Sequence, residues 1–96
     1  MADGEGERGT GPSQGSYDAD RVASSAREAD PGLPRETAVL LARDAWGHLQ
    51  AAGATDPTEI ARRLFADHRA AGATAANVVA VAAVQFCAVH DVDPQG

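Results

Sequence analysis

The chain has 96 residues and a formal net charge of −6 at pH 7, from eight arginines, no lysine and fourteen acidic residues. This length accommodates one small domain, and the acidic balance excludes the broad basic surface needed to bind nucleic acid or an anionic membrane. The single cysteine, Cys87, excludes an internal disulfide and a multi-cysteine zinc site, so we expect a cytoplasmic protein without a cofactor. The longest apolar run, Val78–Val84, is far shorter than the roughly 20 residues of a membrane-spanning helix, so no membrane partner is expected.

Residues 1–16 are predicted to form a disordered, acidic, glycine-rich tail. Met1–Ser16 contains five glycines and, after Met1, no large apolar side chain. Such a segment cannot bury enough apolar surface to offset the entropy that it would lose on ordering. It also lacks the basic start and the apolar stretch of a secretory signal.

Residues 17–32 are predicted to be a weak helix or a linker. The helical candidate is 18–29, with Asp18 or Asp20 as its N-cap. Its apolar residues follow helical spacing on one side: Val22, Ala26 and Ala29. Because this apolar side is thin, the segment is expected to be less stable than the helices that follow it.

Residues 33–96 are predicted to form a helical domain, with helices at 34–52, 57–71 and 75–90. Apolar residues recur at three- and four-residue steps through the first two helices, as expected when one face is buried. The first set is Ala38, Leu41, Ala42, Ala45, Leu49 and Ala52, widened by Val39 and Trp46, and the second is Ile60, Ala61, Leu64, Phe65, His68 and Ala71. Short turns favour antiparallel neighbours, so the predicted fold class is all-α, a three- to four-helix bundle.

A sequence repeat links the first two of these helices. Leu41–Thr55, LARDAWGHLQAAGAT, aligns without a gap with Ile60–Thr74, IARRLFADHRAAGAT. The glycine of each AAGAT is predicted to stop a helix, and the following threonine can cap the next one. Trp46 aligns with Phe65, and both rings are expected to point inward. The repeat reflects either a duplication or two alanine-rich helices that need the same stop signals.

The helix start after the first AAGAT is the best specified in the chain. Asp56-Pro57-Thr58-Glu59 supplies an N-cap, a proline at the first helical position and a glutamate three residues after the cap. After the second AAGAT, Thr74 is predicted to cap the last helix, and Asp91 to end it.

The last helix is apolar on every side apart from Asn77, Gln85 and His90. Such a helix is normally buried all round, yet few other helices exist to cover it. One side should face the other helices: Val78, Val79, Ala82, Ala83, Phe86 and Val89. The other side carries Ala80, Val81, Val84, Cys87 and Ala88.

This second side contains a seam of small apolar residues suited to the close approach of another helix: Val81, Val84 and Ala88, with Cys87 near the edge. We expect a second copy of the chain, or another protein's helix, to dock on it. Two alternatives remain open. Segment 18–29 could fold over the seam, or NVVAV could form a β-strand.

No constellation of catalytic or metal-ligating residues stands out, so no such residue is assigned and an enzyme is not expected. Cys87 and His90 lie three residues apart and could contribute to a metal site or a nucleophile pair. A cysteine in an apolar helix is more often a small buried hydrophobe. Three histidines, His48, His68 and His90, lie near helix ends, where capping or packing accounts for them.

The stretch TEIARRL, Thr58–Leu64, resembles the opening of a helix-turn-helix motif. The helix then runs on, and the next helix has almost no base-reading side chain, so nucleic acid is not the expected partner. The sequence predicts a small non-catalytic helical interaction or adaptor protein, with homodimerisation through the last helix as one form. The alternatives are a small transcriptional regulator contacting DNA or the transcription machinery, and a small-ligand or metal-binding protein using Cys87 and the histidines.

Removal of residues 1–16 is expected to leave the free energy of unfolding essentially unchanged, because the segment has almost no apolar groups to bury. Denaturant midpoints of the full and shortened chains measure this. A loss above about 1 kcal/mol, which is large on the scale of domain stability, would show that the tail packs on the domain.

Overall fold

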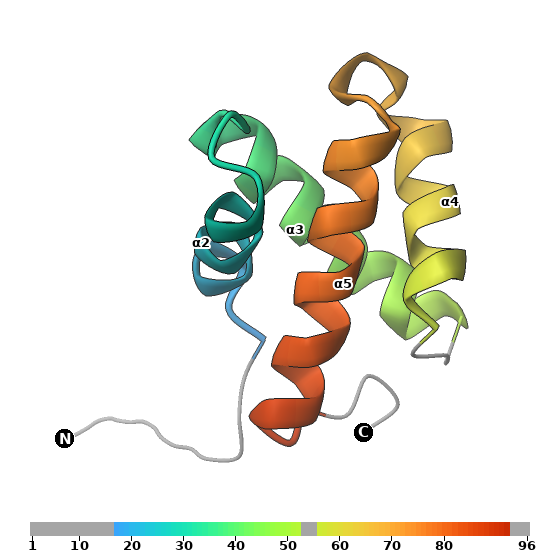
Figure 1. The fold of residues 1–96 in the computed structure, drawn as a ribbon. Coiled ribbons are helices and arrows are strands. Elements are labelled where there is room, and N and C mark those ends of the chain that lie inside the picture. Colours follow the sequence, from blue (N-terminus) through green and yellow to red (C-terminus); the bar gives the residue numbers. More distant parts are fainter. Residues whose placement is uncertain (1–16, 53–55, 93–96) are drawn as a thin grey trace, which may run out of the picture.

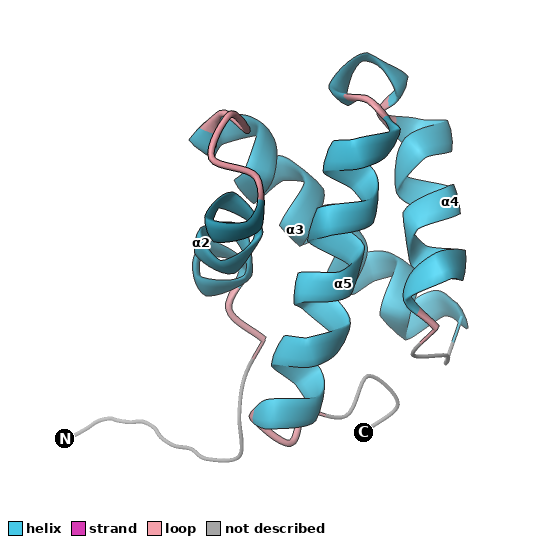
Figure 2. Cartoon of the chain, in the orientation of Figure 1, coloured by secondary structure: helices cyan, strands magenta, loops and turns pink. Residues whose placement is uncertain are grey.

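The computed structural model describes residues 17–52 and 56–92 and contains four α-helices (Figure 1). They are α2 (Ala19–Ala29), α3 (Arg35–Ala52), α4 (Pro57–Asp67) and α5 (Ala73–Val89), with a short 3-10 helix, η1 (Arg69–Ala71), between the last two. Figure 2 shows only helices and loops over the described ranges, which confirms the all-α prediction. The predicted tail, 1–16, and Gly53 of the first AAGAT lie outside the described residues.

Two helices form the middle of the bundle. α3 and α5 contact each other, and each also contacts both α2 and α4. In Figure 1, α5 stands in front of α3, with α2 on one side and α4 on the other. Over the described ranges, no helix combines the length and the apolarity needed to cross a membrane.

The core is built mainly from small side chains. The largest fully buried side chains are Leu41, Leu49, Ile60, Leu64, Val22 and Val79. Alanines fill most of the remaining core positions: Ala23, Ala26, Ala38, Ala42, Ala45, Ala75, Ala76, Ala80, Ala82 and Ala83. The separation of packed helices depends on the side chains at the contact, so this composition brings the helix axes close together. The predicted inward stripe of α3 from Ala38 to Leu49 is buried throughout.

Residues 17–32 are an integral part of the bundle rather than a linker. The Asp18 side chain caps α2 by accepting hydrogen bonds from the backbone N–H groups of Asp20 and Arg21, at 3.1 and 3.3 Å. Val22 and Ala26 are fully buried against α3 and α5, whereas Ala29, predicted on the same side, is exposed. The thin apolar stripe is therefore sufficient to dock α2 on the two central helices.

Tyr17 ties the start of α2 to both central helices. Its ring stacks on Trp46 of α3, with 4.8 Å between ring centroids, and meets Phe86 of α5 edge-on at 5.7 Å. Its hydroxyl donates a hydrogen bond to the carbonyl of Ala42, at 2.6 Å. Aromatic pairs in such geometries contribute beyond their buried area.

The prediction that Trp46 and Phe65 both point inward is wrong for Phe65. Its side chain is 38% exposed, and the Arg69 guanidinium lies 6.0 Å from its ring centroid. Among the α-helices of the described ranges, α4 packs mainly on α5 and α3, and a narrow stripe of Ile60 and Leu64 suffices to bury its inner side. Phe65 follows Leu64 and is rotated by about 100° from it, which places the ring at the edge of the contact.

The end of α4 also differs from the prediction. The helix ends at Asp67 rather than at residue 71, and the backbone N–H of its C-cap, His68, bonds to the carbonyl of Leu64. The single turn of η1 follows.

The start of α5 is set by Gly72 rather than by Thr74. Gly72 has φ +93°, a backbone conformation that residues with a side chain rarely adopt. It reverses the direction of the chain so that the helix begins at Ala73. Thr74 therefore lies inside the first turn, where it cannot act as the N-cap. At the other end Asp91, with φ +57°, follows the last turn as predicted, and the Val92 N–H bonds to the Cys87 carbonyl.

The predicted start of α4 is confirmed. Asp56 is the N-cap, and its side chain accepts a hydrogen bond from the Thr58 N–H at 3.0 Å, with Pro57 at the first helical position. Glu59 bonds instead to the guanidinium groups of Arg62 and Arg63, which lower the pKa of its carboxyl group.

Replacement of Asp56 by alanine is expected to lower the free energy of unfolding by about 0.5–2 kcal/mol, because the Thr58 N–H loses its partner. Urea unfolding followed by circular dichroism measures the change. Asp56→Asn serves as the matched control, since asparagine caps helices about as well. An alanine variant with the parent's midpoint would show that this cap adds nothing.

Tyr17, the only tyrosine of the chain, gives a direct pH test of the fold. Burial raises the pKa of its hydroxyl well above the usual value near 10, and the neighbouring Cys87 thiol adds to the shift. The folded-state pKa thus exceeds the unfolded one, so this stability is fully present below about pH 10 and is lost as the pH rises further.

Ultraviolet absorbance of tyrosinate, recorded with far-ultraviolet circular dichroism, reports this ionisation. Tyrosinate is expected to form only well above about pH 10, together with loss of helix. A tyrosine that ionises near pH 10 while the helices persist would contradict the buried position.

Candidate functional site

The predicted interaction residues of α5 do not all lie on one surface. Val81 is 37% exposed and Ala88 is exposed, whereas Val84 is half-buried and packs against the core. Cys87 is buried, with 4% of its surface exposed, so it is part of the core and not the edge of a seam. Three of the four residues therefore reach the surface.

The division of α5 into two sides needs correction. Ala80, assigned to the outer side, is fully buried, and Val89, assigned to the inner side, is 75% exposed. The reason is that α5 is covered by three helices, so its buried arc is centred between Val79 and Ala83 and extends to Ala80 and Cys87. Periodicity alone could not locate this centre.

One continuous strip of α5 remains in contact with solvent, and we call it the outer face. Its exposed residues are Thr74, Asn77, Val81, Gln85 and Ala88, and the half-buried Val78 and Val84 border it. Successive members are three or four residues apart, as expected for one side of a helix. No residue of α5 is charged from Ala73 to Val89, so the outer face combines aliphatic groups with neutral hydrogen-bonding groups.

The arrangement of Cys87 and His90 does not favour a nucleophile pair. Burial raises the pKa of the Cys87 thiol, which keeps it in its poorly nucleophilic protonated form at neutral pH. The His90 ring lies against Phe86, with 4.3 Å between ring centroids, in an exposed position at the end of α5. The thiol is therefore best understood as a core side chain.

The other two histidines belong to a cluster that the sequence did not predict. His48 Nε2 lies 2.9 Å from Asp67 Oδ2, and His68 Nε2 lies 2.6 Å from Asp44 Oδ2. Each pair joins α3 to the end of α4. Asp44 and His48 are one turn apart on α3, whereas Asp67 and His68 are adjacent in sequence. The histidines lie near helix ends as predicted, but their rings bind carboxylates.

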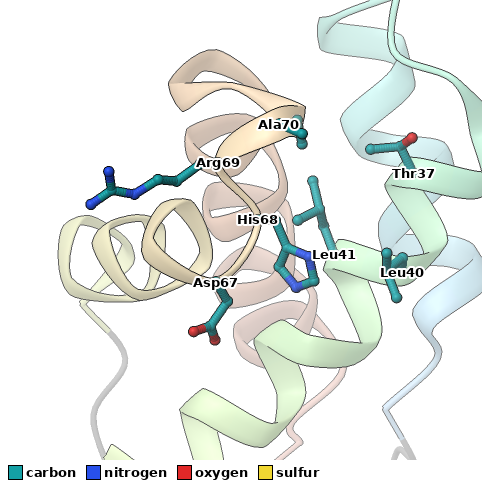
Figure 3. A pocket seen from close by; sticks show the side chains of 8 residues that line it. Thr37, Leu40, Leu41, Asp67, His68, Arg69 and Ala70 are labelled. Carbon is teal, nitrogen blue, oxygen red and sulfur yellow. The ribbon is translucent and has the colours of Figure 1, made fainter.

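A hollow of about 380 Å³ opens beside this cluster (Figure 3). It is lined by Thr37, Leu40, Leu41, Asp67, His68, Arg69, Ala70 and Ala71. Figure 3 shows the His68 ring reaching toward α3 beside Leu41, while the Arg69 side chain points away from the hollow. The hollow lies open on the surface, and half of its lining residues are polar or charged, an arrangement better suited to contact with a side chain than to enclosure of a substrate.

No protein-family model matches the chain, and neither the curated proteins nor the solved structures compared with it contain a match.

Proposed function

We propose that the protein is a small, non-catalytic interaction protein of the cytoplasm that self-associates through the outer face of α5. The observation that carries this proposal is the complete absence of charge from a 17-residue helix with one side in solvent. The aliphatic groups of this uncharged strip favour a contact, because water is released when a partner covers them.

The absence of charge is specific to α5. The exposed sides of the other helices carry charged groups, for example Arg21 on α2, Arg43 on α3 and Arg62 on α4. The chain as a whole has a formal net charge of −6, so two copies repel each other at most orientations. In a contact through α5, neither of the two helices brings a charged side chain into the interface.

The outer face is complementary to itself about Val81. In an antiparallel pair of α5 helices with the two-fold axis at Val81, Asn77 would lie opposite Gln85 of the second copy, four residues to either side. Thr74 would lie opposite Ala88, seven residues to either side. Two amides that can donate and accept would thus flank an apolar centre, as an isologous contact requires.

The dimer is expected to be weak. A single pair of helices buries much less surface than a stable interface of standard size. Self-association should therefore be strongly concentration-dependent. In the adaptor form of this function, a helix of another protein docks on the same face. The chain alone would then stay monomeric.

Replacement of Val81 by aspartate is expected to abolish self-association, because two carboxylates would meet at the two-fold axis without a partner. Sedimentation velocity at low to high micromolar concentration measures it. Leu40→Asp is the matched control: Leu40, 54% exposed on α3, is also an aliphatic residue at the surface. The control should retain the parent's association. Val84 is a poorer choice, since it packs against the core.

A parent that remains monomeric at high micromolar concentration would contradict the homodimer. Equal loss of association in the Val81 and Leu40 variants would show that charge acts generally and that the outer face is not the interface. Unaltered circular dichroism spectra of both variants establish that the comparison concerns association rather than folding.

A further inference from the structure

We propose that Asp44, His48 and Asp67 form a binding site for a divalent transition metal ion of the zinc type, at the crossing of α3 and the end of α4. One ligand atom from each side chain can be chosen so that all three lie within 4.8 Å of one another. This is the only such group of three histidine, cysteine or acidic side chains over the described ranges. The inference is independent of the self-association of α5.

Two helices bring these side chains together in a way that suits chelation. Asp44 and His48 are at positions i and i+4 of α3, so they project from the same side of the helix one turn apart. The same spacing places two ligands on one metal ion in helical zinc sites. Asp67, the last residue of α4, supplies the third group from the opposite side, with its carboxylate 2.9 Å from His48 Nε2.

The proposed metal site is accessible from solvent. The side chain of Asp67 is 50% exposed and that of Asp44 is 43% exposed, so the ion can enter directly from solvent. Within the described residues, neither carboxylate forms an ion pair with an arginine; Arg63, the nearest arginine in sequence on α4, binds Glu59 instead. The two carboxylates are therefore held only by histidines.

The donor set selects the class of metal. Zinc binds imidazole nitrogen and carboxylate oxygen at about 2.0–2.2 Å in a tetrahedron. Ligand atoms must then lie roughly 3.4 Å apart, so the side chains have to close slightly, which half-exposed carboxylates can do by rotation. Calcium and magnesium prefer sites made of oxygen alone with six or more ligands. Two carboxylates and a neutral imidazole also balance the charge of the divalent ion.

His68 has a different role, as a positioning residue. Its Nε2 lies 2.6 Å from Asp44 Oδ2. It can therefore fix the orientation of this carboxylate while the other oxygen faces the metal. Loss of such supporting partners typically weakens metal binding by about 10–100-fold. Water would occupy the fourth position of the tetrahedron.

Titration of the full chain with Zn²⁺ against a chromophoric chelator tests the site. We expect one ion per chain and a higher melting temperature in its presence, because the assembled site exists only in the folded state. His48→Gln and Asp67→Asn should each remove most of the affinity, and His68→Gln should reduce it about 10–100-fold. His90→Gln, which alters the histidine outside the cluster, should bind as the parent does. An excess of Mg²⁺ or Ca²⁺ should not displace Zn²⁺.

The proposal would be overturned by no Zn²⁺ binding by the parent at high micromolar metal, by binding that survives in both His48→Gln and Asp67→Asn, or by ready displacement by Mg²⁺ or Ca²⁺. Nuclear magnetic resonance of the histidine rings of the parent keeps the test decisive if a variant fails to fold. Zn²⁺ should shift the His48 ring signals and leave those of His90 unchanged. A shift confined to His90 would contradict the site.

Discussion

The packing of α5 against three other helices is the constraint on which the rest of the structure depends. A helix without a charged side chain gains most stability when it is surrounded, but the described part of the chain supplies only α2, α3 and α4 to surround it. The buried arc of α5 consists largely of alanines, which allow these helices to approach closely. Three helices still leave one strip uncovered, and the outer face about Val81 is that strip.

The same constraint explains why α2 belongs to the fold. α2 has few apolar residues, yet Val22 and Ala26 are fully buried because α2 packs against both central helices, α3 and α5. Tyr17 strengthens this attachment by stacking on Trp46 and meeting Phe86. Without α2, the parts of α3 and α5 beneath it would face water, and the uncovered surface of α5 would be much wider than the outer face.

On the other side of the bundle, α4 is joined to α3 by polar contacts. The buried stripe of α4 is short, and the two Asp–His pairs between its end and α3 supplement it. Partly exposed pairs of this type contribute little to stability. The three proposed metal-binding side chains and the supporting His68 are therefore held together at modest energetic benefit to the apo protein, and this supports a role in ligand binding.

The sequence predicted those features that depend on local physics. The 3.6-residue period located the buried stripe of α3, and the Asp56-Pro57 pair located the start of α4, because capping and amphipathicity are properties of one segment. Features that depend on several segments were missed. The buried arc of α5 depends on where three helices lie, so Ala80 and Val89 were assigned to the wrong sides.

The candidate metal site was hidden for the same reason. His48 and Asp67 are 19 residues apart, and only the crossing of α3 with the end of α4 brings them together. The i, i+4 spacing of Asp44 and His48 is the one local indication, and it supplies only two of the three ligands. Phe65 was misplaced because the repeat suggested equivalent environments, whereas α3 is a central helix and α4 a peripheral one.

The role of α2 as cover for α5 is tested most directly by urea unfolding of two chains, residues 17–96 and residues 33–96. Circular dichroism follows the loss of helix in each. We expect residues 17–96 to unfold in one cooperative transition. Residues 33–96 should unfold at much lower urea, with a weakened or absent transition, because α3 and α5 lose the cover supplied by Val22 and Ala26. Equal midpoints and slopes for the two chains would contradict it, and residues 33–96 would then be the whole folding unit.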